Sequence, residues 1–148
     1  MSLYKRILVP VDGSATSMKG LREALRIARA EGAKVWVLHV LDEFFALSDP
    51  ESARYADVLI ASFKRGGERV LARASALAKS KGVKAQTLMP EIVGGPAAAE
   101  IVRQGKKVRA DLIVLGTHGR KGVKRLALGS DAESVVRSST VPVLLVRG

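Results

Sequence analysis

Residues 116–130 combine three features of a phosphate-binding segment. Gly116 closes an apolar run that is typical of a buried strand, and Ser130 opens a short helical pattern. Glycines at Gly116, Gly119 and Gly129 allow close backbone approach and positive φ angles. The amide groups and the dipole at a helix N-terminus favour an anion. This segment is therefore a candidate site for a phosphate group.

The charges in this segment agree with an anionic ligand. No acidic residue lies between Gly116 and Gly129. The same stretch holds four cations: Arg120, Lys121, Lys124 and Arg125. A flexible basic loop with glycines at its turns would give the same pattern, so both interpretations stand. The chain contains neither the G-x-x-x-x-G-K-[ST] pattern of a P-loop nor G-x-G-x-x-G, which argues against the usual NTPase and dinucleotide-binding modes.

Ser130 also has a structural interpretation. Ser130-Asp131-Ala132-Glu133 has the form of a capping box, in which Ser130 would cap the backbone of Glu133. The two roles can coexist, because the hydroxyl and the helix amides face the same space. The Asp131 carboxylate suits the helix dipole but would repel a nearby phosphate. It would then point outward, help to hold a magnesium ion, or weaken triphosphate binding.

Other polar side chains carry weaker signals. His39 lies in an apolar run and is interpreted as a hydrogen-bonded core residue, whereas His118 would either touch phosphate or shape the loop. Asp12 could form a turn or a cap beside Ser14. The two histidines lie far apart in the sequence without the carboxylate patterning of a metal site, and no Ser-His-Asp spacing is convincing. We therefore expect no side-chain metal site and assign no catalytic residue.

A second group of cations lies in and after a long helical pattern. It consists of Lys64, Arg65, Arg69, Arg73, Lys79, Lys81 and Lys84. These residues are interpreted as the solvated face of an amphipathic helix. Nucleic acid is not an expected partner, because only 4% of the residues are aromatic and few could stack on bases.

Five apolar runs indicate strands, with helical patterns between them. The strands are expected at residues 7–11, 35–41, 83–89, 111–116 and 141–146. The helices are expected at 18–28 (ending near Gly32), at 51–81 with a kink or break at Gly66-Gly67, at 98–105 after Pro96, and at 130–138. Residues 44–50 are expected to be irregular. This alternation predicts an α/β fold, a doubly wound, Rossmann-like parallel sheet with helices on both faces.

Composition limits the class of protein. A chain of 148 residues suits one domain, residues 1–148, with a proper core. The formal charge of +11 favours anionic partners, and the lack of cysteine excludes disulfides and thiolate metal sites. No apolar stretch approaches the ~18 residues that cross a bilayer. We therefore expect a cytoplasmic protein with no membrane partner.

The glycine spacing resembles that of a known family. Gly116-x-x-Gly119, nine residues and then Gly129-Ser130 is similar to the ATP-binding signature of universal stress proteins. Residues 7–14, 38–40, 110–119 and 141–146 also resemble the family. The resemblance covers nearly the whole chain, and residues 44–67 are its least distinctive part.

The resemblance implies a fold and a nucleotide site. The five strands would have the order 3-2-1-4-5, with the reversal between the first and fourth strands. The turn after the first strand would lie near ribose and adenine, and Val40 would line the adenine pocket. Residues 116–130, here called the glycine segment, would surround ribose and phosphates. The residues expected at the nucleotide are Pro10, Val11, Asp12, Val40, Gly116, His118, Gly119, Arg120, Gly129, Ser130 and Asp131.

The expected ligand is ATP, with ADP or AMP as alternatives and Mg²⁺ accompanying the nucleotide. The protein would be a nucleotide-dependent stress-response or regulatory protein. Any hydrolysis would be slow, because no general base is aimed at a γ-phosphate. One alternative is a nucleotide-independent interaction module that binds acidic partners or nucleic acid. Another is an ATPase or a nucleotidyl transferase, by analogy of fold alone.

The last apolar run predicts an assembly. It begins at Val141, ends at Val146 and is apolar on both faces. An exposed apolar strand at a sheet edge invites pairing with another chain. Universal stress proteins commonly dimerise through this strand, so we expect a homodimer. The sequence does not identify a further protein partner.

Overall fold

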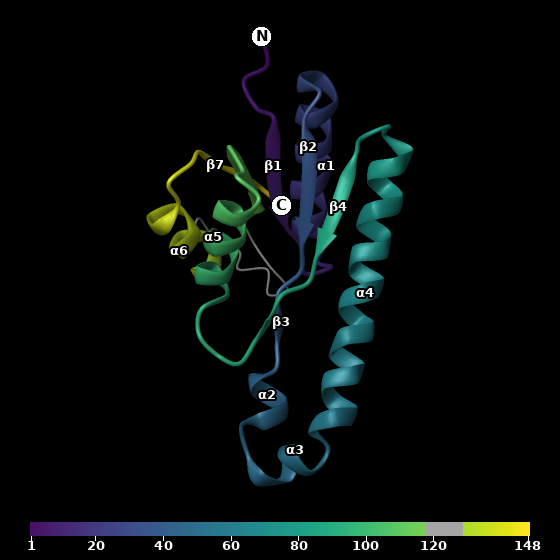
Figure 1. Ribbon diagram of the computed structural model, residues 1–148, viewed down its shortest axis with the longest axis vertical. Helices are drawn as coiled ribbons and strands as arrows, with labels where there is room; N and C mark the ends of the chain where they lie inside the picture. Colours follow the sequence, from purple (N-terminus) through teal and green to yellow (C-terminus); the bar gives the residue numbers. More distant parts are fainter. Residues whose placement is uncertain (118–128) are drawn as a thin grey trace.

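A central five-stranded parallel sheet forms the middle layer of the computed structural model, which describes residues 1–117 and 129–148 (Figure 1). In spatial order its strands are β4 (Ala85–Leu88), β2 (Lys34–Leu38), β1 (Arg6–Pro10), β6 (Leu112–Gly116) and β7 (Val143–Val146). A second, small sheet pairs β3 (Leu41–Asp42) with β5 (Glu91–Ile92). Since β4, β6 and β7 are the third, fourth and fifth of the expected strands, the expected order 3-2-1-4-5 is confirmed.

Helices cover both faces of the main sheet. They are α1 (Ala15–Glu31), α4 (Ala56–Ser80), α5 (Ala97–Lys107) and α6 (Ser130–Ser138). Two short helices, α2 (Phe44–Leu47) and α3 (Pro50–Arg54), lie beyond the end of the sheet (Figure 1). Ile7 and Val9 of β1 pack with α1 and α4, whereas Leu8 packs with α5 and α6. Successive side chains of a strand point to opposite faces. Both faces of β1 are buried, which explains its continuous apolar sequence.

The residues that bound α1 suit their positions. Ser14 precedes the helix, and its Oγ accepts a hydrogen bond from the backbone N–H of Ser17 at 3.1 Å. Gly32 follows the helix with φ +70°, the left-handed conformation expected of a C-terminal glycine. The start of α1 is thereby fixed next to the carboxyl end of β1.

The second strand is shorter than expected. It ends at Leu38, and Leu41 pairs with β5 in the small sheet instead. The backbone N–H of His39 donates to the carbonyl of Leu88, and that of Leu41 to the carbonyl of Pro90, both at 2.9 Å. The chain therefore leaves the main sheet alongside the residues that follow β4, and the apolar run is divided between two sheets.

A kink or a break was expected at Gly66-Gly67, and the break is wrong, because α4 continues through both glycines. The long helical region divides instead at Tyr55, between α3 and α4. A Cβ on Gly67 would lie 2.7 Å from the Sδ of Met89 and 2.8 Å from the Cδ2 of His39. Gly67 therefore allows α4 to approach the ends of β2 and β4 closely.

Two boundaries also differ from expectation. Residues 44–47 form α2, where an irregular stretch was expected. Pro96 precedes α5 as its N-cap residue rather than opening the helix.

Among residues 1–117 and 129–148, no helix has the length and apolar character needed to cross a membrane.

Candidate functional site

The expected site lies at the carboxyl edge of the main sheet. β1 pairs with β2 on one side and with β6 on the other. The chain passes from β1 through α1 to β2, so the strand order reverses between β1 and β6. In Figure 1, β2 and β4 point toward the end of the sheet from which β3 departs. Doubly wound sheets bind ligands beyond the carboxyl ends of their strands at such a reversal.

The turn after β1 is held by short-range hydrogen bonds. Pro10 ends the strand, and the backbone N–H of Val11 donates to the carbonyl of Leu38 at 2.7 Å. The Oδ1 of Asp12 accepts from the N–H of Ser14 at 2.8 Å, and the N–H of Asp12 donates to the Oγ of Ser17 at 3.3 Å. Asp12 thus forms a turn at the start of α1, as one of its two interpretations predicted.

His39 joins the ends of β1 and β2. Its Nδ1 lies 2.9 Å from the carbonyl oxygen of Val11. Since a carbonyl can only accept, this geometry requires Nδ1 to carry the proton. The hydrogen bond expected for His39 is thus present. The next residue, Val40, is half-buried and packs against the core under α5 and α6.

Gly116 ends β6 where the backbone of α1 passes close by. A Cβ at Gly116 would lie 2.4 Å from the carbonyl oxygen of Thr16 and 3.0 Å from the N of Ser17. No other residue type fits this contact without a shift of the backbone. Ser17 also accepts the N–H of Asp12, so it connects the turn after β1 with the end of β6.

Thr117 brings the two ends of the glycine segment together. Its N–H donates to the carbonyl of Val146 at 3.0 Å, and its carbonyl accepts from the N–H of Gly129 at 3.1 Å. Gly116 and Gly129 therefore lie near one another, although twelve residues separate them in the sequence.

The hydroxyl of Thr117 was not expected from the sequence as part of the site. The residue is 7% exposed, and its Oγ1 is buried with no hydrogen-bond partner among the described residues. An unsatisfied buried polar group costs about 1–3 kcal/mol. A ligand that bonds this hydroxyl would remove that cost. The available signal was its position directly after the glycine that ends a buried strand.

The expected capping box at Ser130 is wrong. Gly129 is the N-cap residue of α6 and accepts the N–H of Glu133 at 3.0 Å, so Ser130 lies one position inside the helix. The Glu133 carboxylate pairs with Arg137 at 2.8 Å. Within residues 1–117 and 129–148, no side chain caps the first turn of α6, whose amides and dipole favour an anion. Asp131 is exposed, which agrees with an outward orientation.

Part of the expected site lies outside the described residues. His118, Gly119 and Arg120 belong to that part. The other three cations of the segment, Lys121, Lys124 and Arg125, belong to it as well. The described part places Gly116, Gly129 and Ser130 at one strand end. The neighbouring strand ends carry the remaining described members, Pro10, Val11, Asp12 and Val40.

Comparison with known proteins agrees with this arrangement. The model of the universal stress protein family matches residues 3–147. The chain belongs to this family. One universal stress protein, MJ0531 of Methanocaldococcus jannaschii, is 36% identical over 146 residues, which cover 99% of this chain and 84% of the relative. The structure of universal stress protein UspA from Lactobacillus plantarum has a TM-score of 0.86 at 25% identity, covering 99% and 100% of the two chains.

Two similar universal stress protein structures contain nucleotides. One is a complex with cAMP, with 28% identity, a TM-score of 0.65, and coverage of 99% of this chain and 98% of that chain. The other, from Archaeoglobus fulgidus, is a complex with dAMP, with 25% identity, a TM-score of 0.69, and coverage of 97% and 98%. Nucleotide binding thus occurs in proteins of this family and fold.

Proposed function

We propose that this universal stress protein binds ATP at the carboxyl ends of β1, β2 and β6. The observation that carries the proposal is the buried hydroxyl of Thr117, at the strand end joined to the N-terminus of α6. In the described part of the chain, this hydroxyl has no hydrogen-bond partner and the helix has no side-chain cap. Both features suit the oxygens of a phosphate group. The cAMP and dAMP complexes of similar proteins support an adenine nucleotide as the ligand class.

The phosphates would lie between the end of β6 and the start of α6. Gly116 and Gly129 have no side chains to obstruct a phosphate, and the amide of Ser130 belongs to the first turn of the helix. His118, Gly119 and Arg120 would complete this side. The cations of residues 120–125 would favour a chain of several phosphates over a single one, because each adds positive charge.

The nucleoside would lie over the ends of β1 and β2. Pro10 and Val11 would contact it with backbone and apolar groups, and Val40 would face the adenine. Asp12 would accept a hydrogen bond from a ribose hydroxyl. Two hydrogen bonds already fix the position of the turn after β1: the N–H of Ser14 donates to the Asp12 carboxylate, and the N–H of Asp12 donates to the Ser17 hydroxyl. The turn therefore needs little reorganisation when the nucleotide binds.

Asp131 would not prevent this mode of binding. Because its side chain is exposed, solvent screens its charge from a phosphate at the helix amides. Mg²⁺ would enter with the nucleotide and neutralise part of the phosphate charge. ADP or AMP would bind more weakly than ATP, because each lacks phosphates that the cations would contact.

The nucleotide would act as a regulatory ligand. A triphosphate that bridges β6 and α6 would bias the conformation of the segment between them and so change the surface offered to partner proteins. No residue is assigned as a general base, so hydrolysis would be slow. We further propose that residues 1–148 act as one nucleotide-binding domain in stress response.

The test is to look for nucleotide and then measure binding. Protein purified without added nucleotide is denatured and its supernatant is separated by anion-exchange chromatography, followed by calorimetric titration with ATP and Mg²⁺. We expect retained ATP or micromolar binding, abolished by Gly129→Val. The matched control is Gly66→Val, because a Cβ at Gly66 meets only the Arg69 guanidinium at 3.9 Å. No nucleotide and no heat of binding would instead support the nucleotide-independent interaction module.

We also propose a homodimer through β7, the edge strand after β6. The carbonyls of Pro142 and Val146 face the β6 side, where they accept the N–H groups of Ile113 and Thr117. Since backbone groups alternate along a strand, Val143 and Leu145 turn theirs toward the open edge. At high salt, light scattering should give twice the mass of one chain at micromolar concentration. A monomer would contradict the dimer without affecting the nucleotide proposal.

A further inference from the structure

Residues 41–63, here called the arm, extend away from the main sheet (Figure 1). The arm contains β3, α2, α3 and the start of α4. It holds four of the six aromatic residues of the chain. Of the ten large apolar side chains that are exposed in the described part of the chain, six lie in the arm: Phe44, Phe45, Leu47, Tyr55, Val58 and Phe63. Exposed apolar side chains gathered in this way mark an interaction surface.

The arm is acidic, although the chain is basic. It contains one cation, Arg54, and five carboxylates: Asp42, Glu43, Asp49, Glu51 and Asp57. The net charge of the arm is thus −4, in a chain of formal charge +11. Asp42 and Asp49 accept hydrogen bonds that shape the arm. The other three carboxylates have no cation within 4 Å among the described residues.

A groove of about 500 Å³ lies along the outer side of α1. Its apolar lining comes from Leu25 and Val146. Its charged lining comes from Lys19, Arg22, Glu23, Arg26, Arg29 and Lys81. Arg26 pairs with Glu23 at 2.6 Å, whereas the other four cations have no carboxylate within 4 Å in the described part of the chain. Leu25 is almost fully buried, so Val146 is the partly exposed apolar residue of the lining, beside unneutralised positive charge. The charge of the groove is thus opposite to that of the arm.

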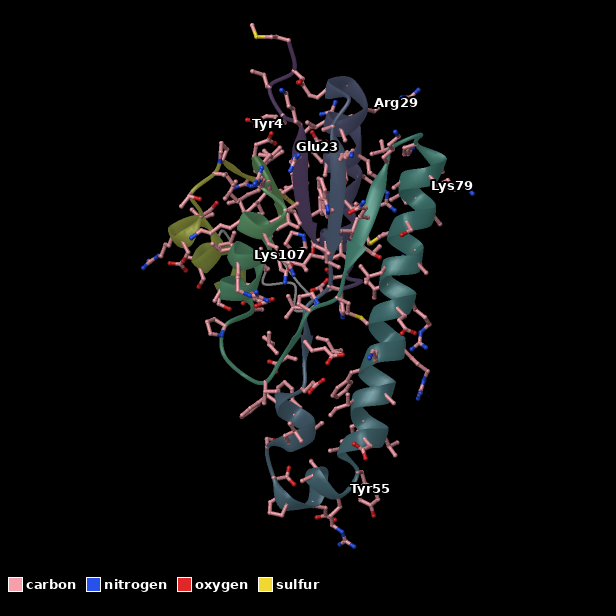
Figure 2. All side chains as sticks on the ribbon, in the orientation of Figure 1. Tyr4, Glu23, Arg29, Tyr55, Lys79 and Lys107 are labelled. Atoms are coloured by element: carbon pink, nitrogen blue, oxygen red, sulfur yellow. The ribbon has the colours of Figure 1, made fainter. Side chains whose placement is uncertain are left out.

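The arm cannot reach the groove of its own molecule. Figure 2 shows Tyr55 of the arm at one end of the molecule, and Glu23 and Arg29 of the groove toward the other. Beyond the arm, α4 continues for 17 residues to Ser80, next to Lys81 at the groove, which is about 26 Å at 1.5 Å per residue. Any contact between arm and groove must therefore join two molecules.

We propose that the arm of one molecule docks in the α1 groove of a second copy of this chain. Two arms would repel one another, because each carries the same negative charge, so an arm–arm contact is disfavoured. The contact is heterologous, because it joins the arm of one molecule to the groove of another. One unused arm and one unused groove therefore remain at the two ends of the assembly. Such contacts build open chains, or rings if the rotation closes. This assembly is distinct from the pairing proposed for β7.

Charge reversal on each side tests the proposal. One variant carries Glu51→Lys and Asp57→Lys in the arm, and another carries Arg22→Glu and Arg29→Glu in the groove. All four residues are exposed and have no ion pair among the described residues, so the fold should be retained. Sedimentation velocity at low salt measures self-association over a range of micromolar concentrations. Lys106→Glu with Lys107→Glu, on α5 at the other face of the sheet, is the matched control.

We expect concentration-dependent association beyond a dimer, weakened by salt. Each reversed variant should raise the dissociation constant of this step by about tenfold or more. In the chain that carries all four substitutions, the arm and the groove each have a net charge of zero, so its association should be as weak as that of the double variants. The control should match the wild type. The proposal is overturned if either double variant associates like the wild type, or if no salt-sensitive association occurs.

Discussion

Gly20 of α1 and Gly116 of β6 meet backbone to backbone. A Cβ on Gly20 would lie 3.0 Å from the N of Gly116, and a Cβ on Gly116 would lie 2.4 Å from the carbonyl oxygen of Thr16, one helical turn before Gly20. The two glycines thus set the depth at which α1 packs on the sheet. They also hold the start of α1 at the strand end where the nucleotide site is proposed.

Gly116→Ala should destabilise the fold. The added Cβ meets backbone atoms, which cannot rotate away as a side chain can, so α1 must shift outward. Overpacking of this kind costs about 1–3 kcal/mol. The free energy of unfolding in urea measures the effect. Stability equal to the wild type would show that α1 can move without cost and that this contact does not set its position.

Gly66→Ala and Gly67→Ala should have opposite effects, although the two positions are adjacent in α4. Alanine at Gly66 should raise the free energy of unfolding by up to about 1 kcal/mol through helix propensity, because its Cβ contacts only the Arg69 guanidinium at 3.9 Å. Alanine at Gly67 should lower it. There the Cβ meets the flexible Met89 side chain and the ring of His39, which the bond to Val11 holds in place.

Thermal denaturation of the two alanine variants distinguishes propensity from packing. The melting temperature should rise for the first variant and fall for the second. If both variants gained stability, helix propensity would outweigh the contact with His39. Gly67 would then not be required for the close approach of α4.

Most strands and helices could be predicted from the sequence because they depend on patterns within each segment. The order of the strands was implied by the resemblance to the family. Apolar runs such as β1 are buried on both faces, and Gly32 ends a helix by a local backbone preference. The mistaken break at Gly66-Gly67 has the opposite origin. Glycine weakens an isolated helix, but the reason for Gly67 lies at His39 and Met89, on other elements.

The candidate site was also predictable only where it depends on a local pattern in the sequence. Glycine spacing located Gly116 and Gly129 correctly at a strand end and a helix start. The capping box failed because the bond from Gly129 to Thr117 begins the helix one residue earlier than the pattern suggests. The buried Thr117 hydroxyl depends on packing around it, which no local pattern in the sequence specifies.

Glu100 should make stability depend on acidic pH. It is buried on α5 and accepts hydrogen bonds from Arg103 at 2.6 and 2.9 Å and from Gln104 at 2.8 Å. The bonds from Arg103 hold the pKa of Glu100 below its ordinary value of 4.5, against the opposing effect of burial. Because the pKa is lower in the folded state, ionised Glu100 stabilises the fold above pH 4.5. This contribution is lost as the pH falls through the folded-state pKa.

Glu100→Gln tests this dependence. At neutral pH the variant should lose about 1 kcal/mol, a modest value because Arg103 is largely exposed. Urea denaturation at neutral pH and at a series of values below pH 4.5 should show the difference from the wild type shrinking with acidity. A constant difference across this range would mean that the charge of Glu100 contributes nothing and that only its shape matters.

Thr117→Val should separate the fold from the ligand. The substitution replaces a buried hydroxyl by a methyl group of similar size, and the hydroxyl has no partner among the described residues. The free energy of unfolding without nucleotide should therefore be unchanged or higher. The affinity for ATP should fall about tenfold, since a hydrogen bond to a charged phosphate contributes about 1.5–3 kcal/mol.

Thr140→Val is the matched control, because Thr140 is an exposed threonine on the chain leading into β7. Calorimetric titration with ATP and urea denaturation should both leave the control close to the wild type. A Thr117→Val protein that binds ATP normally but unfolds more easily would assign the hydroxyl to the fold. In that case the uncapped N-terminus of α6 alone would have to account for phosphate binding. Loss of affinity at full stability would assign the hydroxyl to the nucleotide.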